Sequence, residues 1–167
     1  MACRRTWREP LAGGRTAKSP TTESHIDSLK YLHTILRVTD LEASLHFYGD
    51  ALGLEITRRG DVPAERFTLV YLAPPSQPEA EIELTHNWEP EVYVGGRNFG
   101  HVPYAVDDIY AACERSVAHG VVINQPPHDG RMAFVRSPDS ISIELLQARH
   151  ALAPDEPWSS MPNVGAW

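Results

Sequence analysis

The pattern of apolar and polar positions divides the chain into two similar halves. In each half an apolar segment with an early histidine leads into a short amphipathic helix that ends at a glycine, Gly53 or Gly120. Three further apolar runs, bounded by Pro, Gly and Asp, follow each helix and predict strands. These later strands are expected at residues 54–58, 66–73 and 80–86, and again at 121–124, 131–136 and 141–147. The sequence therefore predicts an α+β fold of two tandem βαβββ modules that form a curved mixed sheet.

The two expected helices carry start signals and one apolar face each. Thr39 can cap the first helix, with Glu42 three residues later as in a capping box. Asp107 or Asp108 can cap the second helix. The faces predicted to point inward carry Leu41, Leu45, Tyr48 and Leu52 in the first helix, and Ile109, Ala112, Cys113 and Val117 in the second.

The flanking segments differ in character from the two modules. Residues 1–28 show no apolar period and predict a disordered extension. After the modules, isolated tryptophans such as Trp158 and Trp167 suggest a tail that docks on an apolar surface. The expected organisation is an extension at 1–28, one domain at 29–147 with module one at 29–89 and module two at 98–147, and a tail at 148–167.

Composition narrows the class of protein. With 42% hydrophobic residues among 167, the chain can form one globular domain, or two small modules that share a core. It has no run of about 18 apolar residues and no apolar section of a secretory signal. Arginine and hydroxyl residues within 1–28 resemble an organelle transit peptide, but the acidic residues there make organelle targeting the less favoured alternative. Two cysteines without metal-binding spacing fit a reducing compartment. We therefore expect a cytoplasmic protein, and the net charge of −7 argues against nucleic-acid binding.

The strongest chemical signal is one histidine and one glutamate at equivalent points of each half. His33 and His101 each lie five residues before a valine, and Glu83 and Glu144 each stand in the tripeptide Ile-Glu-Leu. Any one of these residues alone is typical of an ordinary strand. However, equivalent residues of two copies occupy equivalent positions, and each glutamate projects from the face opposite its apolar neighbours. Two imidazoles and two carboxylates predict an octahedral divalent metal site with open positions, rather than structural zinc.

From about residue 32 to residue 147 the chain resembles the glyoxalase I (lactoylglutathione lyase) family of the vicinal-oxygen-chelate superfamily. The motifs that carry the resemblance are Leu-His-Thr-Ile-Leu-Arg-Val at 32–38, Glu-Leu-Thr-His-Asn-Trp at 83–88, Phe-Gly-His at 99–101 and Ile-Glu-Leu at 143–145. The resemblance implies a homodimer with shared active sites, in which His33 and Glu83 of one subunit face His101 and Glu144 of the other. It also implies that the substrate is the hemithioacetal of methylglyoxal and glutathione. The lack of a long apolar run predicts no membrane partner.

The same resemblance assigns roles to individual residues. It implies that Glu144 is the base that moves a proton, with Glu83 on the opposite face of the substrate. The metal is expected to be nickel or cobalt, with zinc as the alternative, because the chain lacks the insertions of longer zinc-dependent forms. The residues matched to glutathione binding are Arg37, Asn87, Arg97, Arg131 and Met132.

Three local features depart from the family pattern. Ser140 stands where the family has a glycine that accepts a positive φ. The loop at 129–133 is about two residues shorter than in many relatives. Pro103 removes an amide from its strand, which suits an edge strand or a bulge.

Two other classes of function remain open from the sequence. One is a different metalloenzyme of the superfamily, such as an extradiol dioxygenase or a thiol transferase, although a dioxygenase needs only two histidines and one carboxylate. The other is a metal-free drug-binding module, which has no need to keep all four predicted ligands. Metal analysis of the purified protein separates these two classes.

Overall fold

The structure, a computed structural model, describes residues 29–96 and 98–165. The predictions for the extension at 1–28, for Arg97 and for Trp167 lie outside the described residues.

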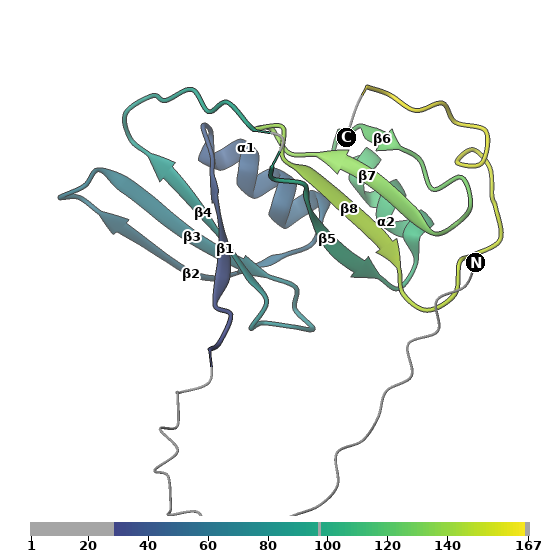
Figure 1. Cartoon of the computed structure of the whole chain (residues 1–167), viewed down its shortest axis with the longest axis horizontal. Helices are drawn as coiled ribbons and strands as arrows, with labels where there is room; N and C mark the ends of the chain where they lie inside the picture. Colours follow the sequence, from purple (N-terminus) through teal and green to yellow (C-terminus); the bar gives the residue numbers. More distant parts are fainter. Residues whose placement is uncertain (1–28, 97, 166–167) are drawn as a thin grey trace, which may run out of the picture. The chain divides into compact units, whose positions relative to one another are not determined.

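Module one contains a four-stranded mixed sheet in the order β1-β4-β3-β2, with one helical segment between its first two strands (Figure 1). Strand β1 runs parallel to β4, whereas β3 is antiparallel to both of its neighbours. Helix α1 continues without a break into the π-helical segment η1. The elements are β1 (His33–Arg37), α1 (Leu41–Leu45), η1 (His46–Ala51), β2 (Glu55–Val62), β3 (Phe67–Ala73) and β4 (Glu81–Asn87).

Module two repeats this arrangement, with the sheet order β5-β8-β7-β6. Its first and last strands, β5 and β8, are again parallel, and the remaining pairs are antiparallel. The elements are β5 (His101–Val106), α2 (Ile109–Ala118), β6 (Ile123–Gln125), β7 (Met132–Arg136) and β8 (Ser142–Gln147). The prediction of two tandem βαβββ modules is confirmed, with one mixed sheet in each module.

The helix starts differ from the prediction in one case. Asp40, not Thr39, caps α1, because its side chain accepts the backbone N–H of Ala43 at 2.9 Å. Thr39 is instead engaged by Asp139 of module two, to which its backbone N–H and its hydroxyl donate at 3.0 and 2.7 Å. The Thr39 prediction is therefore wrong, since a long-range contact takes the hydroxyl. In α2 the cap is Asp108, one of the two predicted alternatives.

Near the end of α2, the buried side chain is not the one that the sequence predicted. Val117, predicted to point inward, is 51% exposed, whereas Ser116 is fully buried. The Ser116 hydroxyl donates to the carbonyl oxygen of Ala112 at 2.9 Å, so its burial leaves no unpaired donor. A hydrogen bond within the helix thus allows a polar residue to take the place expected for an apolar one.

The two modules share one apolar core, which includes Tyr48 of η1 and Cys113 of α2. Polar contacts also join them. Arg115 on α2 donates to the backbone carbonyl of Asp50 at 3.0 Å, and Nε2 of His46 lies 3.1 Å from the backbone carbonyl oxygen of His119. These contacts connect the helical segments of the two modules.

The tail packs on module two, in agreement with the prediction that it docks on an apolar surface. Trp158 is 5% exposed and belongs to the core, with Leu152 and Met161 packed against it. The backbone N–H of Leu152 donates to the carbonyl of Gly130 at 3.0 Å. Gly130 has φ +67°, and a Cβ there would lie 2.2 Å from the Leu152 carbonyl oxygen, so this contact requires glycine.

Among the described residues, no helix is both long and apolar enough to cross a membrane.

Candidate metal centre

The first predicted ligand pair lies on the two parallel strands of module one. His33 begins β1, and Glu83 lies on β4, where its Cα partner is Ile35. Residues two apart on a strand share a face, so the histidine and the glutamate project to the same side of the sheet. Nε2 of His33 lies 2.9 Å from Oε2 of Glu83. We call His33 and Glu83 the first pair.

The second pair, His101 and Glu144, has the same arrangement in module two. His101 begins β5, and Glu144 lies on β8 opposite Pro103. Nε2 of His101 lies 3.0 Å from Oε2 of Glu144. Pro103 belongs to an edge strand, where a missing amide is tolerated, as its position in the sequence predicted.

Neither pair is by itself a complete metal site. Within residues 29–96 and 98–165, no group of three or more His, Cys, Asp or Glu side chains is arranged to hold a metal ion. One imidazole and one carboxylate supply fewer donors than a stable divalent site requires. The donor types nevertheless fit borderline divalent metals such as nickel, cobalt and zinc. Two such pairs must face each other to make the predicted site of four ligands.

The two pairs differ in exposure and in hydrogen bonding. The side chains of His33 and Glu83 are 20% and 8% exposed, against 42% and 13% for His101 and Glu144. The Thr85 hydroxyl donates to Oε1 of Glu83 at 2.9 Å. A carboxylate as buried as Glu83 needs such donors when no metal is bound.

An aromatic ring packs edge-on against each histidine. The ring centroids of His33 and Tyr71 are 5.3 Å apart, and those of His101 and Phe134 are 5.5 Å apart. Sequence analysis missed Tyr71 and Thr85. The alternation of side chains along a strand places Thr85 on the face of Glu83, but finding Tyr71 needs the register between strands.

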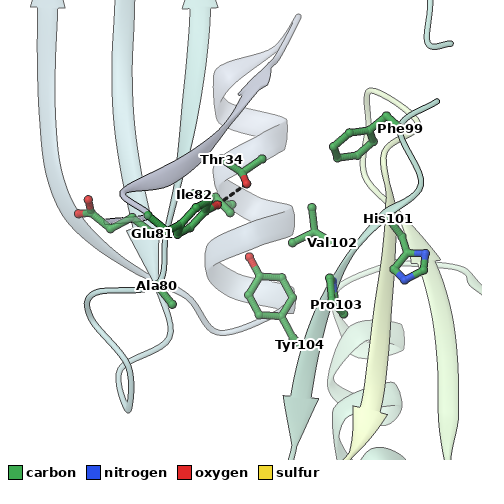
Figure 2. Close-up of a pocket in the computed structure, with 10 residues that line it drawn as sticks. Thr34, Ala80, Glu81, Ile82, Phe99, His101, Val102, Pro103 and Tyr104 are labelled. Atoms are coloured by element: carbon green, nitrogen blue, oxygen red, sulfur yellow. Dashed lines mark hydrogen bonds between the residues drawn. The ribbon is translucent and has the colours of Figure 1, made fainter. Parts of the chain in front are cut away.

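A cleft of about 270 Å³ lies between the β1 and β5 sides of the fold (Figure 2). Thr34 and Ile82 line one side of it, and Phe99 and Val102 line the other. The ring of His101 borders the cleft but turns away from the side chain of Thr34. The cleft wall is therefore mainly apolar, and the second pair lies at its margin.

The residues matched to glutathione binding fall in two places. In module one, Asn87 ends β4, and its amide donates to Oε2 of Glu91 at 2.7 Å and to the Tyr93 hydroxyl at 3.3 Å. Arg37 ends β1. Burial and the Glu91 carboxylate raise the pKa of the Tyr93 phenol, and the positive charge of Arg37 opposes this rise. Arg37 and Asn87 therefore both lie close to Tyr93.

In module two, Arg131 is exposed just before β7, and Met132 is the first residue of that strand. The backbone carbonyl of Arg131 accepts the N–H of Gln147 at 2.8 Å, which ties the loop to the end of β8. Ser140 has φ +63°, the positive value that its place in the turn predicted.

Comparison with known proteins defines the class. Residues 30–145 match the family model of the Glyoxalase/Bleomycin resistance protein/Dioxygenase superfamily. The chain therefore belongs to this superfamily. A lactoylglutathione lyase of Neisseria meningitidis is 42% identical over 127 residues, which cover 72% of this chain and 92% of that protein. A probable lactoylglutathione lyase of Synechocystis sp. is 41% identical over 122 residues, 70% of this chain and 93% of that protein.

Solved structures agree with the sequence comparison. The trypanothione-dependent glyoxalase I of Leishmania major is 37% identical, with a TM-score of 0.66 over 72% of this chain and 87% of that chain. Glyoxalase I from Zea mays is 32% identical, with a TM-score of 0.65 over 74% of this chain and 46% of that chain.

Proposed function

We propose that this protein is a lactoylglutathione lyase that isomerises the hemithioacetal of methylglyoxal and glutathione to S-lactoylglutathione, and so detoxifies methylglyoxal. The observation that carries this proposal is the pair of matched His–Glu contacts, 2.9 and 3.0 Å, at equivalent points of the two modules. Relatives between 37% and 42% identical bear the name lactoylglutathione lyase, and the alignments cover more than nine-tenths of their length.

The active site that we propose is shared between two copies of the chain. The first pair of one subunit faces the second pair of its partner, so a homodimer contains two sites of four ligands each. Strands β1 and β5 are both sheet edges, and large apolar side chains are exposed on or beside them. An apolar surface at a sheet edge favours pairing with a second copy about a two-fold axis. These side chains are Tyr31, Leu32, Ile35 and Phe99.

The residues present fit a divalent metal in this shared site. When bound, such an ion stabilises negative charge on the two vicinal oxygens of the substrate. Glu144 accepts the proton from C1 of the hemithioacetal, and the proton is returned to C2. The aldehyde-derived carbon thus becomes a thioester and the ketone becomes an alcohol, with no net oxidation or reduction.

Glutathione binding is proposed for Arg37, Asn87, Arg97, Arg131 and Met132. Guanidinium groups suit the carboxylates of the tripeptide because they donate two parallel hydrogen bonds. For Asn87 to bind the substrate, its 2.7 Å contact with Glu91 has to open.

We also propose nickel or cobalt as the preferred metal, because an octahedral ion keeps two exchangeable positions after four protein ligands are bound. The proposed location is the cytoplasm, where the buried free thiol of Cys113 remains reduced.

The experiment that tests the function follows thioester absorbance in the ultraviolet. Metal-free protein is loaded separately with nickel, cobalt or zinc and mixed with methylglyoxal that has been preincubated with glutathione. Thioester is expected with nickel or cobalt, at a higher rate than with zinc, and not with metal-free protein or with the His33→Ala variant. Stoichiometric metal without thioester formation would point to another enzyme of the superfamily. A protein that binds no metal would point to a drug-binding module.

A further inference from the structure

The duplicated fold allows the surroundings of Glu83 and Glu144 to be compared position by position. Tyr71 on β3 lies directly opposite Glu83, and Phe134 on β7 lies directly opposite Glu144. Residues directly opposite in an antiparallel pair project from the same face of the sheet. The two rings also pack edge-on against their histidines, with interplanar angles of 84° between Tyr71 and His33 and 81° between Phe134 and His101. Tyr71 and Phe134 are thus structural equivalents that differ by one hydroxyl group.

A second difference lies two residues further along each strand. Thr85 follows Glu83 on the same face, and its hydroxyl donates to Oε1 of Glu83 at 2.9 Å. The equivalent residue after Glu144 is Leu146, whose side chain has no donor. Glu83 is thus flanked by two hydroxyl-bearing side chains at the positions where Glu144 is flanked by two apolar ones.

The ring of Tyr71 is itself held in place. The Arg58 guanidinium lies over it, with Cζ 3.5 Å from the ring centroid, and Arg58 donates to Oε2 of Glu81 at 3.0 Å. The strand register places Tyr71 on the face of Glu83, and its ring packs on His33, the other residue of the first pair.

On the basis of the proposed function, we propose that Tyr71 and Thr85 are positioning residues that hold Glu83 in one orientation as the fixed carboxylate ligand. Phe134 and Leu146 carry no hydroxyl with which to hold Glu144 in this way, so Glu144 is the carboxylate that can leave the metal and accept the substrate proton. Hydrogen bonds to a ligating carboxylate orient it and strengthen metal binding. The two equivalent glutamates of one site thereby have different roles: Glu83 is a fixed ligand and Glu144 is the base.

The test exchanges the two environments. The Tyr71→Phe/Thr85→Val double variant removes the hydroxyls of the two residues that flank Glu83. The Phe134→Tyr variant adds a hydroxyl at the equivalent position opposite Glu144. Nickel affinity is measured by chelator competition without substrate. The double variant should bind nickel roughly 10-fold to 100-fold more weakly, the usual effect of losing such outer partners. Phe134→Tyr should bind nickel at least as tightly as the wild type and keep its KM, but lose about 10-fold in kcat, because Glu144 is then restrained.

Two matched variants control for general damage to the fold. Tyr110→Phe removes a hydroxyl from α2, where it donates to the Ala153 carbonyl at 2.8 Å, and should leave nickel affinity unchanged. Thr85→Ser keeps the hydroxyl and should retain the nickel affinity that Thr85→Val loses. Thermal unfolding of every variant separates loss of fold from loss of the contact.

Wild-type nickel affinity in the double variant, or an equal loss in Tyr110→Phe, would overturn the proposal. Unchanged kcat in Phe134→Tyr would also overturn it. If the wild-type protein binds nickel but forms no thioester, while the double variant binds nickel more weakly, the proposed function fails and the anchoring of Glu83 stands. If the wild-type protein binds no divalent metal, both proposals fail.

Discussion

Nε2 of His101 lies 3.0 Å from Oε2 of Glu144, and the first pair in module one repeats this contact at 2.9 Å. The repetition arises because the first and last strands of each module are parallel neighbours with the same register. A role for one pair therefore implies a role for the other, and the variants below test the two together.

Replacing His101 by Ala should remove most of the bound metal, because three donors remain where four were proposed. Metal content after gel filtration, measured by elemental analysis, checks this. His150→Ala is the matched control, since His150 is exposed in the tail. Stoichiometric metal in His101→Ala would exclude the four-ligand site.

Mixing two inactive variants should restore activity if sites are shared between subunits. In a mixed dimer of His33→Ala and Glu144→Gln, one site carries both lesions and the other carries neither. Turnover after the subunits have exchanged, relative to each parent alone, is the measurement. Mixed dimers that form and stay as inactive as the parents would rule out the shared site.

The Glu144→Gln change should lower kcat by roughly 10² or more, the usual contribution of a general base. Glutamine keeps an oxygen that can contact the metal but cannot accept the proton, so metal content should fall only modestly. Glu83→Gln, which changes the other carboxylate, should cost less turnover. The opposite ranking, with metal bound in both variants, would reverse the two roles.

The contact between the modules at His46 should stabilise the fold more at low pH. Hydrogen bonding to Asp50, followed by the contact with the His119 carbonyl, raises the pKa of His46 above its usual 6.5. Both partners are acceptors, so both ring nitrogens must carry protons to satisfy them. The stabilisation is then fully present below pH 6.5 and is lost as pH rises through the raised pKa.

The difference in Tm between wild type and His46→Gln, measured from about pH 5 to about pH 8, should therefore shrink with rising pH. The His119 ring lies 5.4 Å from that of His46, so the same comparison in a His119→Gln background isolates the titration of His46. A Tm difference that is constant across this range would refute the prediction.

Truncating Trp158 should destabilise module two, because the side chain is 5% exposed and belongs to the shared core. Trp158→Ala should cost about 3 to 5 kcal/mol of unfolding free energy, and Trp158→Phe less, as measured by urea denaturation. A loss below about 1 kcal/mol for Trp158→Ala would mean that the tail contributes little to the fold.

The sequence by itself determined the two modules, their order of elements and the candidate ligand pairs. Apolar periodicity is a local property, and duplication places His33 and His101, like Glu83 and Glu144, at equivalent points of equivalent sheets. The positive φ of 63° at Ser140 could also be anticipated, because the family pattern has a glycine at this place in the turn.

Only the tertiary structure decided which side chains meet across the chain. Asp139 engages Thr39 from 100 residues away, which leaves the cap of α1 to Asp40. Only the strand register shows that Tyr71 lies opposite Glu83 and Phe134 opposite Glu144, so the sequence alone did not reveal that the two glutamates have different neighbours. The physical reason is that hydrogen bonds and packing between distant segments depend on which strands lie side by side, and no local pattern contains that information.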